Sequence, residues 1–185
     1  MLFISNSKIT ANKVDVSAND DAFHGSWAGA GAFNFFGKSQ AAENTNVAIG
    51  GAVAYSDNSK NVDAIIKNST INAAQIKNIA SRDDSDVSAG MGLAVSTNKG
   101  DQGTNVDVAI SASINFIEGD THALLLNNTV KGGSIENKAA IDSLQVAGGL
   151  DIAGSSSGGK GFNLGGAAAA SKITNDLQSG IKGGS

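Results

Sequence analysis

A glycine-rich stretch with a lysine is the first place where residue spacing suggests chemistry. Gly154, Gly159 and Lys160 stand at the G-x-x-x-x-G-K spacing of a phosphate-binding loop. Such a loop also needs a Ser or Thr directly after the lysine, to bind a metal ion, and a helix that follows. The next residue here is Gly161 and no convincing helix follows. The stretch therefore predicts a flexible corner.

Histidines and aspartates are the candidate metal ligands. His24 and His122 have no local partner at metal-ligand spacing, and His122 takes the repeat position of Asp63, which we predict to be variable and exposed. An oxygen-rich cation site could draw on five aspartates: Asp20, Asp21, Asp83, Asp84 and Asp86. The glycine-aspartate nonapeptide of calcium-binding β-rolls is absent, so solvated loops are the preferred interpretation.

Carboxylates could also cleave carbohydrate if a pair met across a groove. Asp63, Asp107 and Glu118 are conceivable members of such a pair, but nothing in the linear pattern brings them together. Asn68 and Asn127 begin N-x-T sequons at matching repeat positions, which a recurring turn explains without glycosylation. We expect no enzyme activity, no catalytic residue, no cofactor or cofactor-binding residue and no metal ligand.

Aromatic side chains are concentrated in one short stretch, which makes it a possible surface binding patch. The alternative is an aromatic stack that fills the wide part of one coil, or a dimer face. The stretch contains Phe23, Trp27, Phe33, Phe35 and Phe36.

Internal repeats indicate how these residues are positioned. Residues 4–18 (ISNSKITANKVDVSA) align with 66–80 (IKNSTINAAQIKNIA) and with 125–139 (LLNNTVKGGSIENKA). The chain forms a single domain of three near-complete units and the start of a fourth, at approximately 1–62, 63–121, 122–176 and 177–185. Copies should lie on top of one another, with Ile71 and Val130 in a common column.

Alternation with period two predicts that each unit is built from strands. In NVDVAISASINF, residues 105–116, the Val and Ile side chains share one face, and Asp107 shares the other face with Ala, Ser and Asn residues. Repeats of ~60 residues with about three such segments predict an all-β, right-handed parallel β-helix with coils of roughly 20 residues, three per repeat. The absence of Pro agrees, because Pro would remove ladder donors.

Two local alternatives remain open. Residues 134–149 also fit a helix, with Ser134 as N-cap and Gly148 as a stop, although the preceding copy breaks that pattern with its aspartates. Asn78 and Asn137 occupy equivalent positions and could stack their amides in a ladder, or could both be turn residues.

Composition excludes several classes of protein. The net charge is −4 and the 13 Lys and Arg residues are scattered, which argues against a nucleic-acid surface. Cys is absent, so disulfides and thiolate metal sites are excluded. No apolar run approaches the ~20 residues of a membrane span. Unpaired strand edges at both ends predict self-association or stacking on further repeats.

The repeat texture resembles that of large filamentous bacterial adhesins. Units of the form xAxIxNSTVxA, IxNxA, GxGLAVS and NVxVAxSAxxNxI, as in residues 63–73 and 105–116, are similar to leukotoxin-family and haemagglutinin-like autotransporter passengers. NVAIGGAVAYSDNS (46–59) also resembles the repeat of trimeric autotransporter heads, but only locally.

The resemblance implies a right-handed β-helix on the bacterial surface, anchored in the outer membrane through another part of the parent chain. It implies adhesion to a host or bacterial receptor, with a glycan as one candidate, as a virulence function without catalysis. A polysaccharide-binding or polysaccharide-cleaving β-helix is the alternative.

Overall fold

The computed structural model describes residues 1–36, 45–98, 103–157 and 160–183, and these residues form strands and no helix. The nine strands are β1 (Leu2–Ser5), β2 (Lys8–Phe36), β3 (Thr45–Ser59), β4 (Val62–Lys67), β5 (Thr70–Asn98), β6 (Thr104–Leu126), β7 (Thr129–Lys131), β8 (Ser134–Ser157) and β9 (Lys160–Lys182). Nothing in these ranges is a helix long and apolar enough to cross a membrane. The chain is therefore all-β over its described length.

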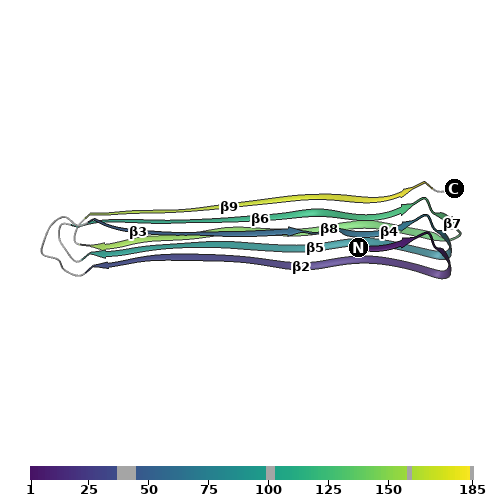
Figure 1. The fold of residues 1–185 in the computed structure, drawn as a ribbon, viewed down its shortest axis with the longest axis horizontal. Helices are drawn as coiled ribbons and strands as arrows, with labels where there is room; N and C mark the ends of the chain where they lie inside the picture. The colour runs from purple at the N-terminus through teal and green to yellow at the C-terminus, as the bar shows by residue number, and fades with distance from the viewer. Residues whose placement is uncertain (37–44, 99–102, 158–159, 184–185) are drawn as a thin grey trace.

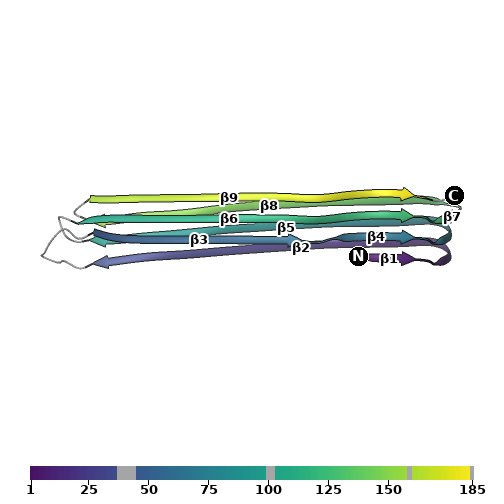
Figure 2. The same ribbon diagram turned by 45° about the horizontal axis from the view of Figure 1, so that its top comes forward.

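All strand pairs are parallel and belong to two sheets. In one sheet, β3 and β4 pair with successive parts of β6, β1 pairs with β4, and β9 pairs with the other side of β6. In the other sheet, β5 lies between β2 on one side and β7 and β8 on the other. Figures 1 and 2 show the two sheets running side by side along the same axis, with strands of opposite direction.

Neighbouring strands are one whole repeat apart in sequence. Lys8 pairs with Thr70, Gln75 with Ser134 and Thr104 with Lys160. Ile71 and Val130 are register partners, so the predicted column is confirmed. The predicted coil of about 20 residues is wrong, because each repeat runs once along each sheet in long strands and no pairing joins residues 20 positions apart in the described chain.

Left-handed asparagines form one corner where the chain passes between sheets. Asn6, Asn68 and Asn127 have φ values of 51°, 49° and 51°, and Gly183 continues the column with a φ of 61°. The backbone N–H groups of the three asparagines each donate to a carbonyl oxygen of the next repeat at 2.8–3.1 Å. Asn tolerates this conformation better than other non-glycine residues, which explains why the N-x-T triplet recurs as a turn.

An ordinary apolar core lies next to this corner. Its buried members come from both sheets, and Ile66, Ile71, Ile76 and Leu125 are at most 2% exposed. Asn78 lies within it, completely buried, and donates to the Ala64 carbonyl oxygen at 3.0 Å and to the Asn137 Oδ1 at 2.8 Å. The asparagine ladder is thus confirmed.

Farther along the strands the usual arrangement of side chains is inverted. In β3 and in residues 105–115 of β6 the buried positions are Ala, Gly, Ser, Asn and Asp, whereas the Val, Ile and aromatic residues between them face outward. Ile49, Val53 and Ile110 are 67%, 66% and 54% exposed. The inner space of this region is therefore filled by small and polar groups.

Close approach of the two sheets explains the inversion. A methyl group added to Gly50 would overlap the Leu93 carbonyl group, and one added to Gly90 would lie 2.8 Å from the Ala112 oxygen. Branched side chains do not fit in that space, so they occupy the outer faces. Hydrogen bonds across the gap partly satisfy the enclosed polar groups, as between Ser88 and Ser113.

The helical alternative for residues 134–149 is wrong. These residues belong to β8, which pairs with β5 from Gln75–Ser134 to Asn98–Ser157. Pairing to a long neighbouring strand satisfies the backbone N–H and C=O groups that a helix would have satisfied internally.

Candidate functional site

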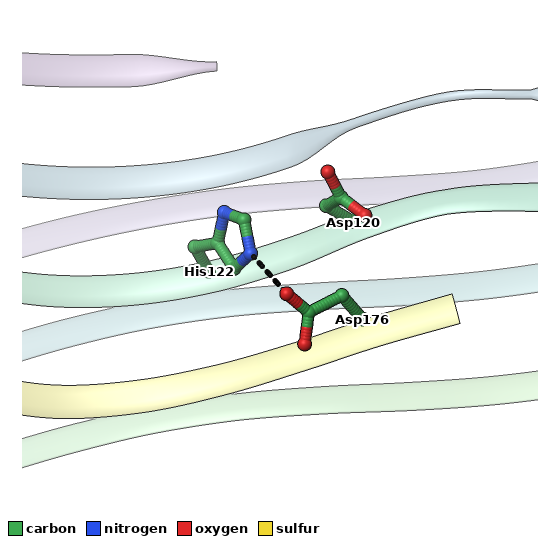
Figure 3. Close-up of side chains that lie close together, drawn as sticks. All are labelled: Asp120, His122 and Asp176. Carbon is green, nitrogen blue, oxygen red and sulfur yellow. Dashed lines mark ion pairs between the residues drawn. The ribbon is translucent and has the colours of Figure 1, made fainter.

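A histidine between carboxylates is the strongest cluster of chemically capable side chains in the described part of the chain. His122 and Asp120 project from the same face of β6, and Asp176 is the register partner of Asp120 on β9. One ring nitrogen of His122 and one oxygen from each aspartate lie within 4.8 Å of one another. Figure 3 shows the imidazole turned toward Asp176, and the distance from Nε2 to its Oδ2 is 3.6 Å.

The other ring nitrogen of His122 faces a third aspartate. The distance from Nδ1 to Asp63 Oδ1 is 3.1 Å, and the Asp63 side chain is 7% exposed. Asp63 and His122 are register partners on β4 and β6, which confirms that they share a repeat position. His122 was expected to be exposed, but its side chain is only 21% exposed. Its strand, β6, lies between β4 and β9, and an aspartate on each of these strands faces the imidazole.

Asp120 is held at its backbone. Its N–H donates to Asn61 Oδ1 at 2.9 Å, and Gly119, with a φ of 139°, directly precedes it. A Cβ atom on Gly119 would overlap the Lys60 carbonyl oxygen, so glycine is required there. The cluster is therefore built on three paired strands, and it could bind a proton or a cation.

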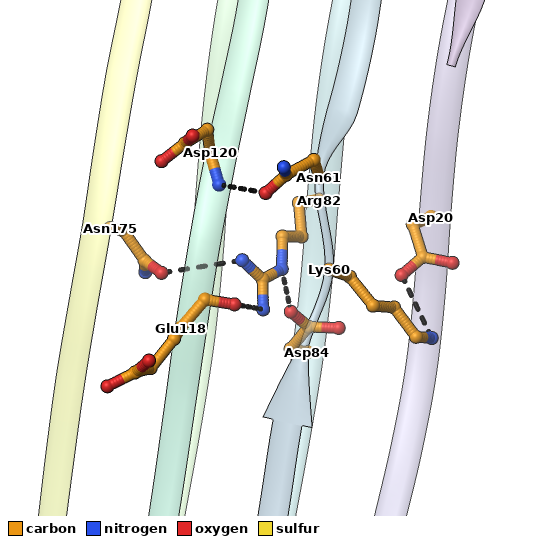
Figure 4. A network of polar contacts seen from close by, with 8 residues as sticks. All are labelled: Asp20, Lys60, Asn61, Arg82, Asp84, Glu118, Asp120 and Asn175. Carbon is orange, nitrogen blue, oxygen red and sulfur yellow. Dashed lines mark hydrogen bonds and ion pairs between the residues drawn. The ribbon is translucent and has the colours of Figure 1, made fainter.

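Arg82 organises a second polar cluster between the sheets (Figure 4). Its side chain is fully buried, and its Nε donates to the buried Asp84 carboxylate. Its Nη2 donates to the Glu118 carbonyl oxygen at 3.1 Å and its Nη1 to Asn175 Oδ1 at 3.4 Å. Because the guanidinium has no contact with solvent, its role is to join strands.

The predicted solvated aspartate loops are wrong. Asp83, Asp84 and Asp86 lie within β5, and Asp20 and Asp21 lie within β2. Asp84 and Asp86 point inward and are fully buried. Arg82 provides a compensating charge for Asp84, and alternation sends Asp83 to the solvent side, whereas both carboxylate oxygens of Asp86 are buried without a hydrogen-bond partner.

The aromatic residues do not fill the interior. Phe23, Trp27 and Phe33 lie on the outer face of β2 and are 70%, 73% and 54% exposed, so the predicted interior stack is wrong for these three. Phe35 and Phe36 belong to the same strand, but their side chains lie outside the described part. A groove of about 520 Å³ with an apolar lining runs beside Trp27, with Met91 and Leu150 among its walls.

The three carboxylates considered for carbohydrate cleavage are not brought together. Asp107 is buried between the sheets, whereas Glu118 stands eleven positions later on the same strand, about 36 Å away along an extended chain. Asp63 contacts His122 instead. A glycosidase pair is separated by less than about 10 Å.

The glycine-rich stretch does not have the surroundings of a phosphate loop. Lys160 begins β9 and no helix follows it, while Gly159 lies outside the described residues. His24 lies on the inner face of β2 as the register partner of Asp86. Neither the glycine-rich stretch nor His24 forms a candidate site.

The sequence did not identify Asp120 and Asp176 as companions of His122. The signal that could have found them was the repeat alignment itself, extended through 56 positions from Asp120 to Asp176. Eroded similarity in the last unit hid that register.

Comparison with known proteins gives no relative. No family model, no curated protein and no solved structure matches the chain.

Proposed function

We propose that the chain is a non-enzymatic, structural and adhesive segment of a bacterial surface adhesin, wound as a right-handed parallel β-solenoid with one coil per repeat. The observation that carries the proposal is the residue-by-residue stacking of three repeats, which leaves broad faces of apolar and aromatic side chains open to contact. Such a framework presents broad side-chain faces and needs no reactive group. Right-handed winding is the usual sense for parallel strands joined by crossovers.

The outer face of β2 is the proposed contact surface. Phe23 and Trp27 alternate there with Gly25 and Gly29, and both rings lie close to Gly25, where a Cβ atom would be 3.3 Å from the Trp27 Nε1 atom and 3.5 Å from the Phe23 ring. Exposed aromatic side chains of this kind contribute much of the binding energy at protein interfaces. Extracellular exposure, through anchoring elsewhere in a parent chain, is part of the proposal.

A binding assay with the purified chain tests this function. Beads coated with the chain should adhere to epithelial or bacterial cells, and the double substitution Phe23→Ser and Trp27→Ser should reduce adhesion at least tenfold if these rings make the contact. Asp21→Asn on the same outer face is the matched control and should adhere normally. The proposal would be refuted if the unaltered chain did not adhere, or if the double variant adhered as strongly as the Asp21→Asn control.

A polysaccharide-binding function is the second candidate, and the groove beside Trp27 favours it. Its floor includes Gly29, Ala89 and Gly148, so a flat ring could lie against the Trp27 indole without obstruction. A glycan array separates the two functions. Binding of the chain to a sugar on the array, and its loss in Trp27→Ala, would favour the second candidate. Hydrolysis of that sugar would contradict the non-enzymatic proposal.

A further inference from the structure

We propose that Asp120, His122 and Asp176 form a binding site for a divalent transition-metal ion such as Zn²⁺. One imidazole nitrogen and two carboxylate oxygens converge within 4.8 Å of one another, so rotation of the side chains alone would bring all three to the ~2.0–2.2 Å that a single zinc ion requires. Nitrogen and oxygen ligands in this combination suit zinc and its neighbours, and three protein ligands leave one position open to water.

Asp63 makes His122 a suitable ligand. Its carboxylate lies 3.1 Å from Nδ1 and is nearly buried, so it accepts the Nδ1–H and leaves the Nε2 lone pair directed to the aspartates. Metal-binding histidines commonly have such a carboxylate behind them, which fixes the tautomer and raises ligand basicity. Asp63 is therefore a positioning residue and does not touch the ion.

The charge of the cluster favours a cation. Asp63, Asp120 and Asp176 supply three carboxylates around one imidazole, and in the described part of the chain none of them forms an ion pair with Lys or Arg. The Asp176 side chain is 70% exposed, so an ion can enter from solvent. A protonated His122 held between carboxylates is the competing explanation, and it predicts no affinity for metal.

Binding would join two strands. Asp120 and His122 are on β6 and Asp176 is on β9, which is an edge strand with mostly exposed side chains. An ion shared by both strands links the edge to the interior of the sheet. Metal should therefore slow amide hydrogen exchange in β9 more than in β2, which lies in the other sheet.

Titration of the untagged, full chain with Zn²⁺ tests the site. We expect one equivalent to bind by calorimetry, and Ca²⁺ or Mg²⁺ at the same concentration not to compete. Asp176→Asn and His122→Gln should each lower the affinity at least tenfold, and Asp63→Asn should lower it about 10–100-fold. Asp142→Asn, an exposed acid of β8 in the other sheet, removes the same charge and should bind as the unaltered chain does.

Nitrogen NMR of the imidazoles supplies a readout that a purely structural role would not change. The chain has two histidines, so their signals are separable. Zn²⁺ should shift Nε2 of His122 while its Nδ1 stays protonated, and should leave His24 unchanged. The proposed site would be overturned if the chain did not bind Zn²⁺, or if the His122 and Asp176 variants bound it as tightly as the unaltered chain. A shift at His24 in place of His122 would also overturn it.

Discussion

Two adjacent glycines test which face of the strands lies inside the molecule. Gly50 and Gly51 are neighbours in β3 and point to opposite faces. A Cβ atom on Gly50 would overlap the Leu93 carbonyl group, 2.9 Å from its carbon, whereas one on Gly51 would have its nearest atom, the Ile110 oxygen, at 3.6 Å. The first distance requires the backbone to move and the second is ordinary contact.

The expected magnitudes follow from these distances. Replacement of either glycine by alanine reduces the entropy of the unfolded chain by the same amount, which stabilises the fold by about 0.4–1 kcal/mol. Overpacking against a backbone group costs about 1–3 kcal/mol, and no change of rotamer can relieve it. Gly51→Ala should be neutral or slightly stabilising, and Gly50→Ala should lie about 1–3 kcal/mol below it.

Urea unfolding of the two variants at equal concentration measures this difference, because the shared entropic contribution cancels. Thermal unfolding should show the same order, with about 2–4 °C per kcal/mol for a chain of this size. A larger loss of stability in Gly51→Ala than in Gly50→Ala would refute the inverted arrangement and place the apolar side chains inside.

Three further predictions concern buried and surface polar groups. Arg82→Met should lower the free energy of unfolding by about 3–5 kcal/mol, measured by chemical denaturation, because it leaves the Asp84 carboxylate buried and unpaired. Adding Asp84→Leu should restore most of the lost stability. A double variant as unstable as the single variant would contradict this prediction. Asn78→Ala should cost about 1–3 kcal/mol in the same assay, since it leaves buried acceptors without a donor; an unchanged midpoint would dispute the ladder. The hydrogen bond from the Tyr55 hydroxyl to Asp57 raises the pKa of Tyr55. The stability that this hydrogen bond provides is therefore present below about pH 10 and is lost as the pH rises through the raised pKa. Asp57→Asn should lower the pKa of Tyr55 in an ultraviolet titration of the single tyrosine, and an unchanged titration curve would contradict the hydrogen bond.

Much of the stacking could be predicted because the repeats are written in the sequence. The pairs Ile4 with Ile66 and Ala80 with Ala139 follow from the alignment, and the structure has them as register partners. Coil length could not be predicted in the same way. Asp83, Asp84 and Asp86 imitate a turn, and only the pairing of β5 with β2 and β8 on its two sides shows that the strand continues through them.

The inner face was also beyond prediction from alternation alone. A period of two shows that Val108 and Ile110 share one face of β6 and that Asp107 and Ala109 share the other, but it does not say which face another sheet will approach. The usual expectation that branched residues are enclosed fails where the separation of the sheets excludes them. Alternation places Asp120 and His122 on one face of β6, but Asp176 became their neighbour only through strand register.

Long strands also determine how such a chain grows. A strand of 29 residues, such as β5, extends about 95 Å, while each added repeat of roughly sixty residues advances the stack by only about 4.8 Å. Three repeats therefore make a thin slab that is much longer along its strands than along the direction in which the repeats stack. Its side faces are therefore much larger than its two ends, and adding a whole repeat scarcely increases its height.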